Sequence, residues 1–366
     1  MNSVDAESAL SPSGRTEPAP NPRPAASEAA LRHVRPFSRA DGIPGAGHVS
    51  DTACPRPDVA AQTLALHDDA IDWVGMQRIA TPILFDGGDG DTQNCHAQVD
   101  AFVNLKRPDR RGIHMSRLYL LMNRHLGMQL VTAGLLESLL RTFLESHEDL
   151  ADRARIGVHF DYLVRRMALR SGHHGWRAYP VSLEASLIDG VFHLELRTQV
   201  VYSSTCPASA ALSRQLIQER FARDFGEREP LEHAAVLEWL GSGRGIVATP
   251  HAQRSVARLQ VRYVSGAHPD LVGLLDRVER SLRTAVQTAV KREDEQAFAL
   301  INGKNPMFCE DAARRIRRAL DSDRDIAGFR VRVEHQESLH AHDAVAQVGR
   351  NFPEPGRAFD IDHDFI

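Results

Sequence analysis

Five short segments of this chain combine the side chains that bind transition metals and transfer protons. They read RGIHMSR (111–117), SSTCPAS (203–209), HAQRS (251–255), KREDE (291–295) and ESLHAHDA (337–344). Thiols, imidazoles and carboxylates are the common ligands of such metals and the common general acids and bases. Each segment interrupts sequence with ordinary core-like periodicity. The pattern therefore predicts a catalytic site assembled from distant parts of the chain.

The thiol of Cys206 is the first candidate. It follows a predicted strand and precedes a proline, so we expect it where the chain turns. A lone intracellular cysteine is more often a small buried hydrophobic residue, and that interpretation stays open for Cys206 taken alone. His251, at the entrance to a predicted strand, and Glu295, in a charged cluster at the end of a predicted helix, are individually compatible with an ordinary solvated surface. Only their combination indicates a site.

A cluster of ionisable side chains follows the last predicted strand. Glu337, His340, His342 and Asp343 fall within seven residues, which packing does not explain. Because histidine titrates near neutral pH, the two imidazoles are the best candidates for a general acid and a general base.

The elements that must position these residues follow from the spacing of apolar side chains. Alternation predicts strands, and a spacing of three or four residues predicts helices. A tight Asp189–Gly190 turn predicts a hairpin and hence antiparallel pairing. The predicted strands cover 97–105, 158–167, 179–187, 191–202, 256–264 and 329–335, and the predicted helices cover 118–144 (two helices), 269–290 and 306–320. The pattern predicts an α+β fold with antiparallel strand pairing, in which one module occurs twice.

The chain divides by composition into four parts. Residues 1–60 are rich in Ala, Pro and Ser and have too little periodic apolar surface to fold, so we predict a disordered tail there. The first module is predicted at 95–210 and the second at 251–350. Between them, 211–250 is charged and helix-prone and is predicted to be a surface insertion or linker.

Length, composition and charge limit the classes of protein to which this chain can belong. With 366 residues and 42% hydrophobic content, the chain can bury a full core. A net charge of −4 without a dominant block gives no reason to expect nucleic acid or a membrane surface as a partner. No apolar run approaches the roughly 20 residues of a membrane-spanning helix. Four well-separated cysteines without a CxxC pair favour the reducing cytoplasm.

Six motifs in order resemble the signature of the type IB GTP cyclohydrolases, a bacterial metal-dependent family. They are RGIHMSR, the Cys-Pro-x-Ser turn, H-x-QRS, KR-x-DE, NP-x-F-x-EDA-x-R (305–314) and ES-x-H-x-HDA (337–344). The resemblance spans about 97–346 and is far more specific than any single motif.

The resemblance implies a catalytic divalent metal bound by Cys206, His251 and Glu295. Glu295 is chosen over Glu293 because the family often has proline at the latter position. Mixed ligation by sulfur, nitrogen and oxygen suits manganese, zinc or iron and does not choose among them. Glu310 would accept the N–H hydrogens of the guanine edge.

The same resemblance assigns the remaining site residues. Glu337, His340 and His342 would be the further catalytic groups beside Cys206, with His342 the first choice for proton transfer. The triphosphate would be bound by cations and N–H or O–H donors, namely His114, Ser116, Arg117, Lys291 and Arg292. Arg117 could equally pair with a structural carboxylate.

The implied reaction converts GTP and water to 7,8-dihydroneopterin triphosphate and formate by metal-activated attack of water on C8, the first step of tetrahydrofolate and pterin biosynthesis. The implied structure is the bimodular tunnelling fold (T-fold), assembled as a homotetramer. Two alternatives stay open: a related metal-dependent enzyme that opens the GTP ring to another product, and a non-catalytic T-fold interaction protein.

Two features depart from the family pattern. Ala208 stands where the family commonly has a second cysteine, which leaves the predicted ligand Cys206 in place. The segment between Cys206 and His251 is longer than in most relatives, so 215–245 must loop out if both ligands are to meet. Lengthening a loop costs only about 0.6 kcal/mol per doubling.

Overall fold

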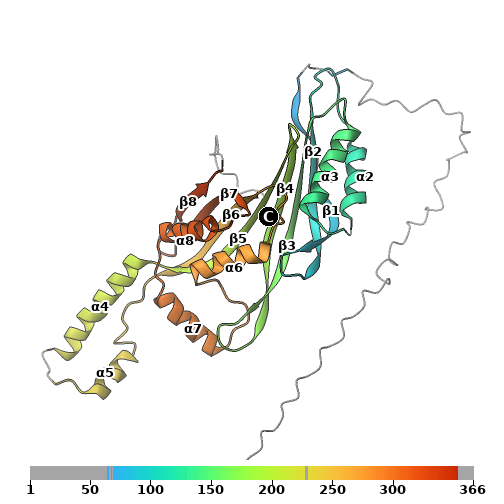
Figure 1. The fold of residues 1–366 in the computed structure, drawn as a ribbon. Helices are drawn as coiled ribbons and strands as arrows, with labels where there is room; N and C mark the ends of the chain where they lie inside the picture. Colours follow the sequence, from blue (N-terminus) through green and yellow to red (C-terminus); the bar gives the residue numbers. More distant parts are fainter. Residues whose placement is uncertain (1–63, 66, 68, 128, 227–229, 353–366) are drawn as a thin grey trace, which may run out of the picture. The chain divides into compact units, whose positions relative to one another are not determined.

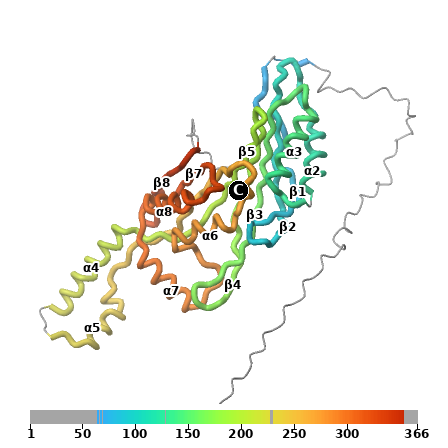
Figure 2. Tube along the Cα trace, in the orientation of Figure 1, coloured from blue at the N-terminus to red at the C-terminus, as the bar shows by residue number. Residues whose placement is uncertain are grey.

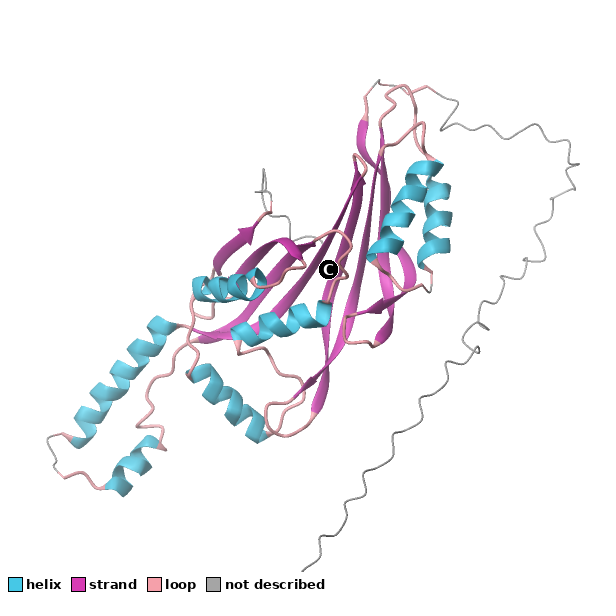
Figure 3. Ribbon diagram, viewed as in Figure 1, coloured by secondary structure: helices cyan, strands magenta, loops and turns pink. Residues whose placement is uncertain are grey.

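An eight-stranded antiparallel sheet is the framework of the folded chain (Figures 1 and 3). The computed structural model describes residues 64–352 except 66, 68, 128 and 227–229. The strands lie side by side in the order in which they occur along the chain. They are β1 (Ile71–Asp86), β2 (Thr92–Leu105), β3 (Arg153–Met167), β4 (His174–Ile188), β5 (Val191–Thr205), β6 (Ala252–Tyr263), β7 (Ile326–His335) and β8 (Ala344–Arg350).

Helices cover one face of this sheet in two groups. One pair packs against β1 to β4, and another pair packs against β5, β7 and β8 (Figure 1). The first pair is α2 (Met115–Leu126) and α3 (Ala133–Ser146), and the second is α6 (Leu271–Leu282) and α8 (Cys309–Asp321). The described part of the chain also contains α4 (Pro207–Phe225), α5 (His233–Leu240) and α7 (Arg292–Gly303).

Alternation in the sequence explains which face of the sheet is covered. In β2, Val99, Ala101 and Val103 are fully buried beneath the helices. The intervening side chains, such as Gln98 and Asp100, lie on the other face and line a polar cavity. Burial of apolar side chains on one face stabilises both layers, at about 25 cal/mol per Å² of apolar surface.

Most predicted elements are confirmed, and the α+β antiparallel architecture with them. The hairpin between β4 and β5 turns at Asp189 (φ 51°) and Gly190 (φ 77°), the positive φ values that a type I′ turn requires. Three predictions were wrong. The first strand is β1 and not the strand near 97–105, and the helix predicted over 269–290 ends at Leu282. KREDE begins helix α7 instead of ending a helix.

The predicted division of the chain is not decided by the structure. The predicted tail, 1–60, lies outside the described residues. The two predicted modules belong to one continuous sheet, in which β5 and β6 pair from Glu195 and Arg262 to Thr205 and Ala252. The predicted insertion contains α5 and most of α4, and in Figure 2 these helices extend beyond the sheet. Trp239 joins them by packing edge-on against Phe221 and Phe225.

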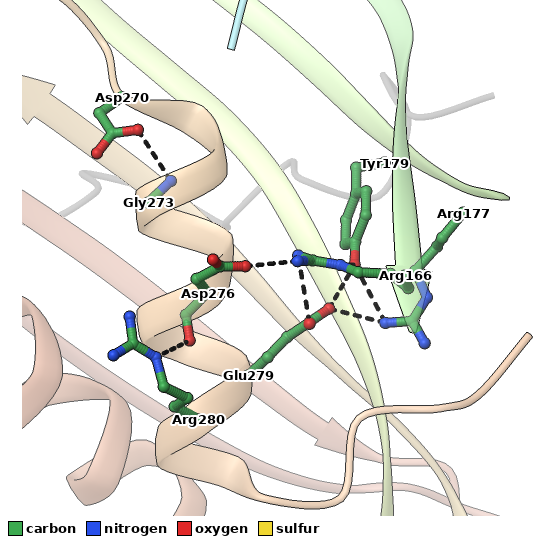
Figure 4. A network of polar contacts seen from close by, with 8 residues as sticks. All are labelled: Arg166, Arg177, Tyr179, Asp270, Gly273, Asp276, Glu279 and Arg280. Atoms are coloured by element: carbon green, nitrogen blue, oxygen red, sulfur yellow. Dashed lines mark hydrogen bonds and ion pairs between the residues drawn. The ribbon is translucent and has the colours of Figure 1, made fainter. Parts of the chain in front are cut away.

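A polar network fastens α6 to the sheet (Figure 4). The Glu279 carboxylate accepts hydrogen bonds from the Tyr179 hydroxyl at 2.5 Å and from Arg177 at 2.7 Å, and Arg166 lies 3.3 Å away. Burial and the neighbouring carboxylate raise the pKa of Tyr179 to about 12. Arg166 also pairs with Asp276 on the same helix. The network aligns α6 with β3 and β4.

Replacing Glu279 by alanine is expected to lower the free energy of unfolding by about 3 kcal/mol, because two largely buried arginines lose their shared anion. Denaturant unfolding measures this loss. Arg280→Ala on the same helix is the control, since Arg280 is exposed and, among the described residues, donates to the Asp276 carbonyl and to no side chain. Equal stabilities of the two variants would contradict the role of the network.

Candidate active site

Four strand termini meet at one end of the sheet and bring the predicted residues together. Antiparallel pairing sets Thr205, at the end of β5, opposite Ala252, at the start of β6. It likewise sets His335, at the end of β7, opposite Ala344, at the start of β8. The segments that join these strand ends therefore gather at the same end of the sheet. Met307, two residues before α8, donates its N–H to the Thr205 carbonyl of β5 at 3.0 Å and so holds the start of α8 there.

A cavity of about 440 Å³ lies at this edge. It is lined by residues from four of the six motifs, including six predicted site residues: Cys206, His251, Glu310, Glu337, His340 and His342. A larger cavity of about 670 Å³ lies on the helix-free face of β1 to β5 and contains none of the predicted residues. The smaller cavity is the better candidate, because independent motifs converge on it.

Cys206 and His251 are held together by the backbone. Cys206 is the N-cap of α4, and its N–H donates to the His251 carbonyl at 3.2 Å. The His251 N–H in turn donates to the Ser209 hydroxyl at 3.1 Å. The thiol is half-buried, and its sulfur accepts a hydrogen bond from the Ser209 N–H at 3.5 Å. These contacts hold Cys206 and His251 next to each other along the backbone, at the point where the insertion leaves the sheet and returns to it.

The tautomer of His251 follows from its neighbour Gln253. The Gln253 amide donates from Nε2 to the Ser204 hydroxyl at 2.8 Å, which leaves its Oε1 as an acceptor 2.9 Å from His251 Nδ1. Nδ1 therefore carries the proton, and the lone pair lies on Nε2. A hydrogen bond of this kind orients histidines that bind metals. Gln253 was not predicted as a site residue, although it stands in the HAQRS motif.

Glu310 lies in the first turn of α8, and a thiol supports it. Its neighbour Cys309 is buried, and the Cys309 sulfur lies 3.3 Å from Glu310 Oε2, so the S–H donates to the carboxylate. Burial and this carboxylate raise the pKa of Cys309 to about 11. Cys309 therefore stays protonated at neutral pH and acts as a donor.

The loop after β7 supplies the other polar groups of the cavity. Glu337 Oε2 lies 3.8 Å from His251 Nδ1. The rings of His340 and His342 stack in parallel, with centroids 5.0 Å apart and planes at 8°. Both histidines are exposed. They can therefore exchange protons with solvent and with a bound molecule.

Glu295 does not join this group within one chain. It is exposed in the first turn of α7 and does not line the cavity. Across the described residues, no group of three or more His, Cys, Asp or Glu side chains is arranged to hold a metal ion. Two of the three predicted ligands, Cys206 and His251, line the same cavity, and metal binding by all three stays a prediction.

Asp294 explains why α7 begins at the KREDE motif. Its buried carboxylate accepts the N–H groups of Arg170 (2.7 Å), Ser171 (3.0 Å) and Lys291 (2.8 Å). Burial opposes the charged form, but these N–H donors outweigh it and hold the pKa of Asp294 below its usual range. The neighbouring Lys291 and Arg292 are exposed and lie outside the cavity.

The three candidates at the start of α2 also lie outside the cavity. His114 is the N-cap of α2, and Ser116 and Arg117 follow it in the first turn, both exposed. Arg117 donates to the Ser146 carbonyl at 2.7 Å, so one of its N–H groups binds the chain itself and not a structural carboxylate. The triphosphate role of these residues stays a prediction.

His335 lines the back of the cavity and was not predicted. It is 3% exposed, and burial lowers its pKa from 6.5 to about 4. Between these values the unfolded chain binds a proton that the folded chain does not, so stability falls as the pH falls. From pH 6.5 to pH 4 this one group removes about 3 kcal/mol of stability.

Replacing His335 by glutamine is expected to remove this pH dependence, so the free energy of unfolding of the variant should fall about 3 kcal/mol less than that of the wild type between pH 6.5 and pH 4. Denaturant unfolding at a series of pH values compares the variant with the wild type. Parallel profiles over this range would show that His335 ionises as readily in the folded chain as in the unfolded chain.

Comparison with known proteins identifies the relatives of this chain. Residues 57–346 match the model of a family described as type I GTP cyclohydrolase folE2. A GTP cyclohydrolase FolE2 of Pseudomonas putida is 52% identical over 291 residues, which cover 79% of this chain and 94% of that protein. The GTP cyclohydrolase FolE2 of Bdellovibrio bacteriovorus is 48% identical over 294 residues, which cover 80% of this chain and 96% of that protein.

Similar solved structures are more distant. A uricase from Arthrobacter globiformis has a TM-score of 0.42 at 8% identity and covers 79% of this chain and 96% of its own. A uricase from Bacillus fastidious has a TM-score of 0.42 at 9% identity, covering 76% and 92%. Scores of this size do not assign a fold family. Within the described residues, no helix is long and apolar enough to cross a membrane.

Proposed function

The chain belongs to the type I GTP cyclohydrolase FolE2 family and is a GTP cyclohydrolase of folate and pterin biosynthesis, and we propose that the cavity at the end of β5 to β8 is its active site. The observation that carries this proposal is the convergence of Cys206, His251 and Glu310 on one cavity from three separate motifs. We propose that the products are 7,8-dihydroneopterin triphosphate and formate.

We propose that Cys206 and His251 bind a divalent metal through the thiolate and Nε2. The donor set fits such an ion, because the Gln253 acceptor fixes the proton of His251 on Nδ1 and leaves Nε2 with a free lone pair in a residue that lines the cavity. When bound, the cation supplies the Lewis acidity that makes water nucleophilic enough to attack C8. Manganese, zinc and iron all suit these ligands.

The protein side chains have separate roles in this proposal. The Glu310 carboxylate accepts N1–H and the exocyclic N–H of guanine and so orients C8 toward Cys206 and His251. His342 and His340 lie at the exposed side of the cavity, where they transfer protons to the ring nitrogen and from the hydrated carbon during C8–N cleavage. Glu337, 3.8 Å from His251, balances the charge of the site.

We propose that the chain is a bimodular T-fold subunit of a cytoplasmic homotetramer. Strands β1 and β8 are at the two edges of the sheet, and an unpaired edge tends to pair with another chain. Apolar side chains at the cavity are exposed, with Leu339 at 65% and Leu212 at 61%. A second copy that covers this mouth would bring Glu295 to the metal, and the cationic residues at the starts of α2 and α7 to the triphosphate.

Subunit mixing tests this arrangement. Neither Cys206→Ala nor Glu295→Ala is expected to be active alone. If each site takes the two ligands from different copies, a one-to-one mixed assembly regains about one quarter of wild-type turnover, because chance pairing leaves that share of sites intact. Formate release from co-expressed, differently tagged subunits measures it. Complete inactivity of the mixture would place both ligands in one chain.

A further inference from the structure

A buried pair of polar rings lies behind the proposed guanine site. The Tyr202 hydroxyl and His335 Nε2 are 2.9 Å apart, and the two rings meet edge to face at 72°. Tyr202 is fully buried in β5, and His335 is 3% exposed at the end of β7. The proposed mechanism uses neither residue. A buried polar pair beside a binding cavity is costly unless its hydrogen bonds are satisfied.

The hydrogen bond between the rings fixes the tautomer of His335. A buried hydroxyl must donate its proton, and His335 Nε2 is the acceptor that the described part of the chain offers to Tyr202. Nε2 therefore accepts, and the proton of the neutral ring lies on Nδ1. Burial keeps the ring neutral at physiological pH, since it lowers the pKa of His335 to about 4.

The Nδ1–H group faces the cavity. Within the described residues Nδ1 of His335 has no hydrogen-bonding partner. Nδ1 is also not fully enclosed by protein atoms, so a bound molecule can reach it. His335 is one of the residues that line the cavity together with Glu310. The negative charge of Glu310 acts on the ring, so the two groups are near each other. The cavity therefore offers an acceptor, the Glu310 carboxylate, beside a fixed donor.

This donor and acceptor pair matches one edge of guanine. The guanine edge carries N–H donors at N1 and N2 next to the acceptor O6, whereas adenine carries a donor at position 6. We propose that His335 donates its Nδ1–H to guanine O6 and thereby selects purines that have an acceptor at position 6. The proposal rests on the guanine-anchoring role of Glu310 and adds the residue that reads the adjacent atom.

Exchanging O6 for sulfur tests the contact, because a thione is a weaker acceptor at the same position. For the wild type, kcat/KM is expected to fall about 10-fold from GTP to 6-thio-GTP, the effect of one hydrogen bond. In His335→Leu, kcat/KM for GTP is expected to be about 10-fold lower than in the wild type, and the values for GTP and 6-thio-GTP should agree within about 2-fold. We call the fall in kcat/KM from GTP to 6-thio-GTP the sulfur penalty. An equal sulfur penalty in both proteins would overturn the proposal.

Further variants separate recognition from folding. His335→Gln is the rescue variant, because its amide can accept from Tyr202 and still donate to O6, and it should restore most of the sulfur penalty. Tyr202→Phe frees the tautomer of His335 and should reduce the penalty. If His335→Leu does not fold, His335→Gln and Tyr202→Phe test the contact with O6 instead. A full sulfur penalty in Tyr202→Phe together with no sulfur penalty in His335→Gln would reject that contact.

The failure of this proposal is distinguishable from failure of the Glu310 anchor. Inosine triphosphate lacks the 2-amino group but keeps O6, so the Glu310→Ala variant should lose its preference for GTP over inosine triphosphate while keeping the sulfur penalty. Loss of the sulfur penalty in His335→Leu alone supports the O6 contact even if Glu310 proves not to bind the amino group.

Discussion

Cys206→Ala and His251→Ala are each expected to lose the bound metal and to turn over GTP at least about 1,000-fold more slowly than the wild type. This is the largest effect that we expect. The proposed cation would supply several kcal/mol of transition-state stabilisation, and neither remaining ligand would hold it alone. Metal analysis after reloading with manganese, zinc or iron, together with formate release, measures both quantities. Secondary structure should be unchanged, because both side chains lie at an edge of the sheet and not in its core.

Matched controls exist for both substitutions. Cys95 is a buried free cysteine in β2, and His233 is an exposed histidine at the start of α5, so Cys95→Ala and His233→Ala should keep their metal and their turnover. Full activity in Cys206→Ala would remove the thiol from the proposed site. Metal retained without turnover would instead make Cys206 a catalytic group and not a ligand.

Glu310→Ala is expected to weaken GTP binding about 100-fold and to leave metal content unchanged. The carboxylate would make two charge-assisted hydrogen bonds to the guanine edge, worth about 3 kcal/mol together. Calorimetric titration with GTP and metal analysis separate the two properties. Glu293→Ala, an exposed acid on α7, is the control. Unchanged GTP affinity in Glu310→Ala would show that another group holds the base.

Local sequence predicted which residues gather at one cavity better than it predicted the outer strands of the sheet. Cys206, His251 and the loop from Glu337 to His342 are short polar segments at strand ends, and antiparallel pairing brings such ends together. Strand β1 was missed because its alternation is irregular. The register shifts twice between Ile71 and Ile79, and Arg78 has a φ of 57°, so the two-residue period is interrupted.

Two other features could not follow from periodicity. Helix α7 contains few buried residues, since only Asp294 of its twelve is fully buried, and a helix without an apolar stripe gives no hydrophobic signal. The roles of Gln253 and His335 depend on hydrogen bonds between strands, from Gln253 to Ser204 and between His335 and Tyr202, which no pattern within one segment encodes. Glu295 is exposed and does not line the cavity in one chain, so its proposed role as a ligand requires the proposed second copy.

The hydrogen bond from Cys206 N to His251 O gives the insertion a further significance. The intervening 44 residues leave and return at a single closed neck, so their length does not alter the separation of the two side chains. Ala208, Ser209 and Leu212, at the start of this segment, line the cavity and must stay in place. The part of the segment beyond Leu212 can change in length without moving Cys206 or His251, and a foreign domain could be inserted there.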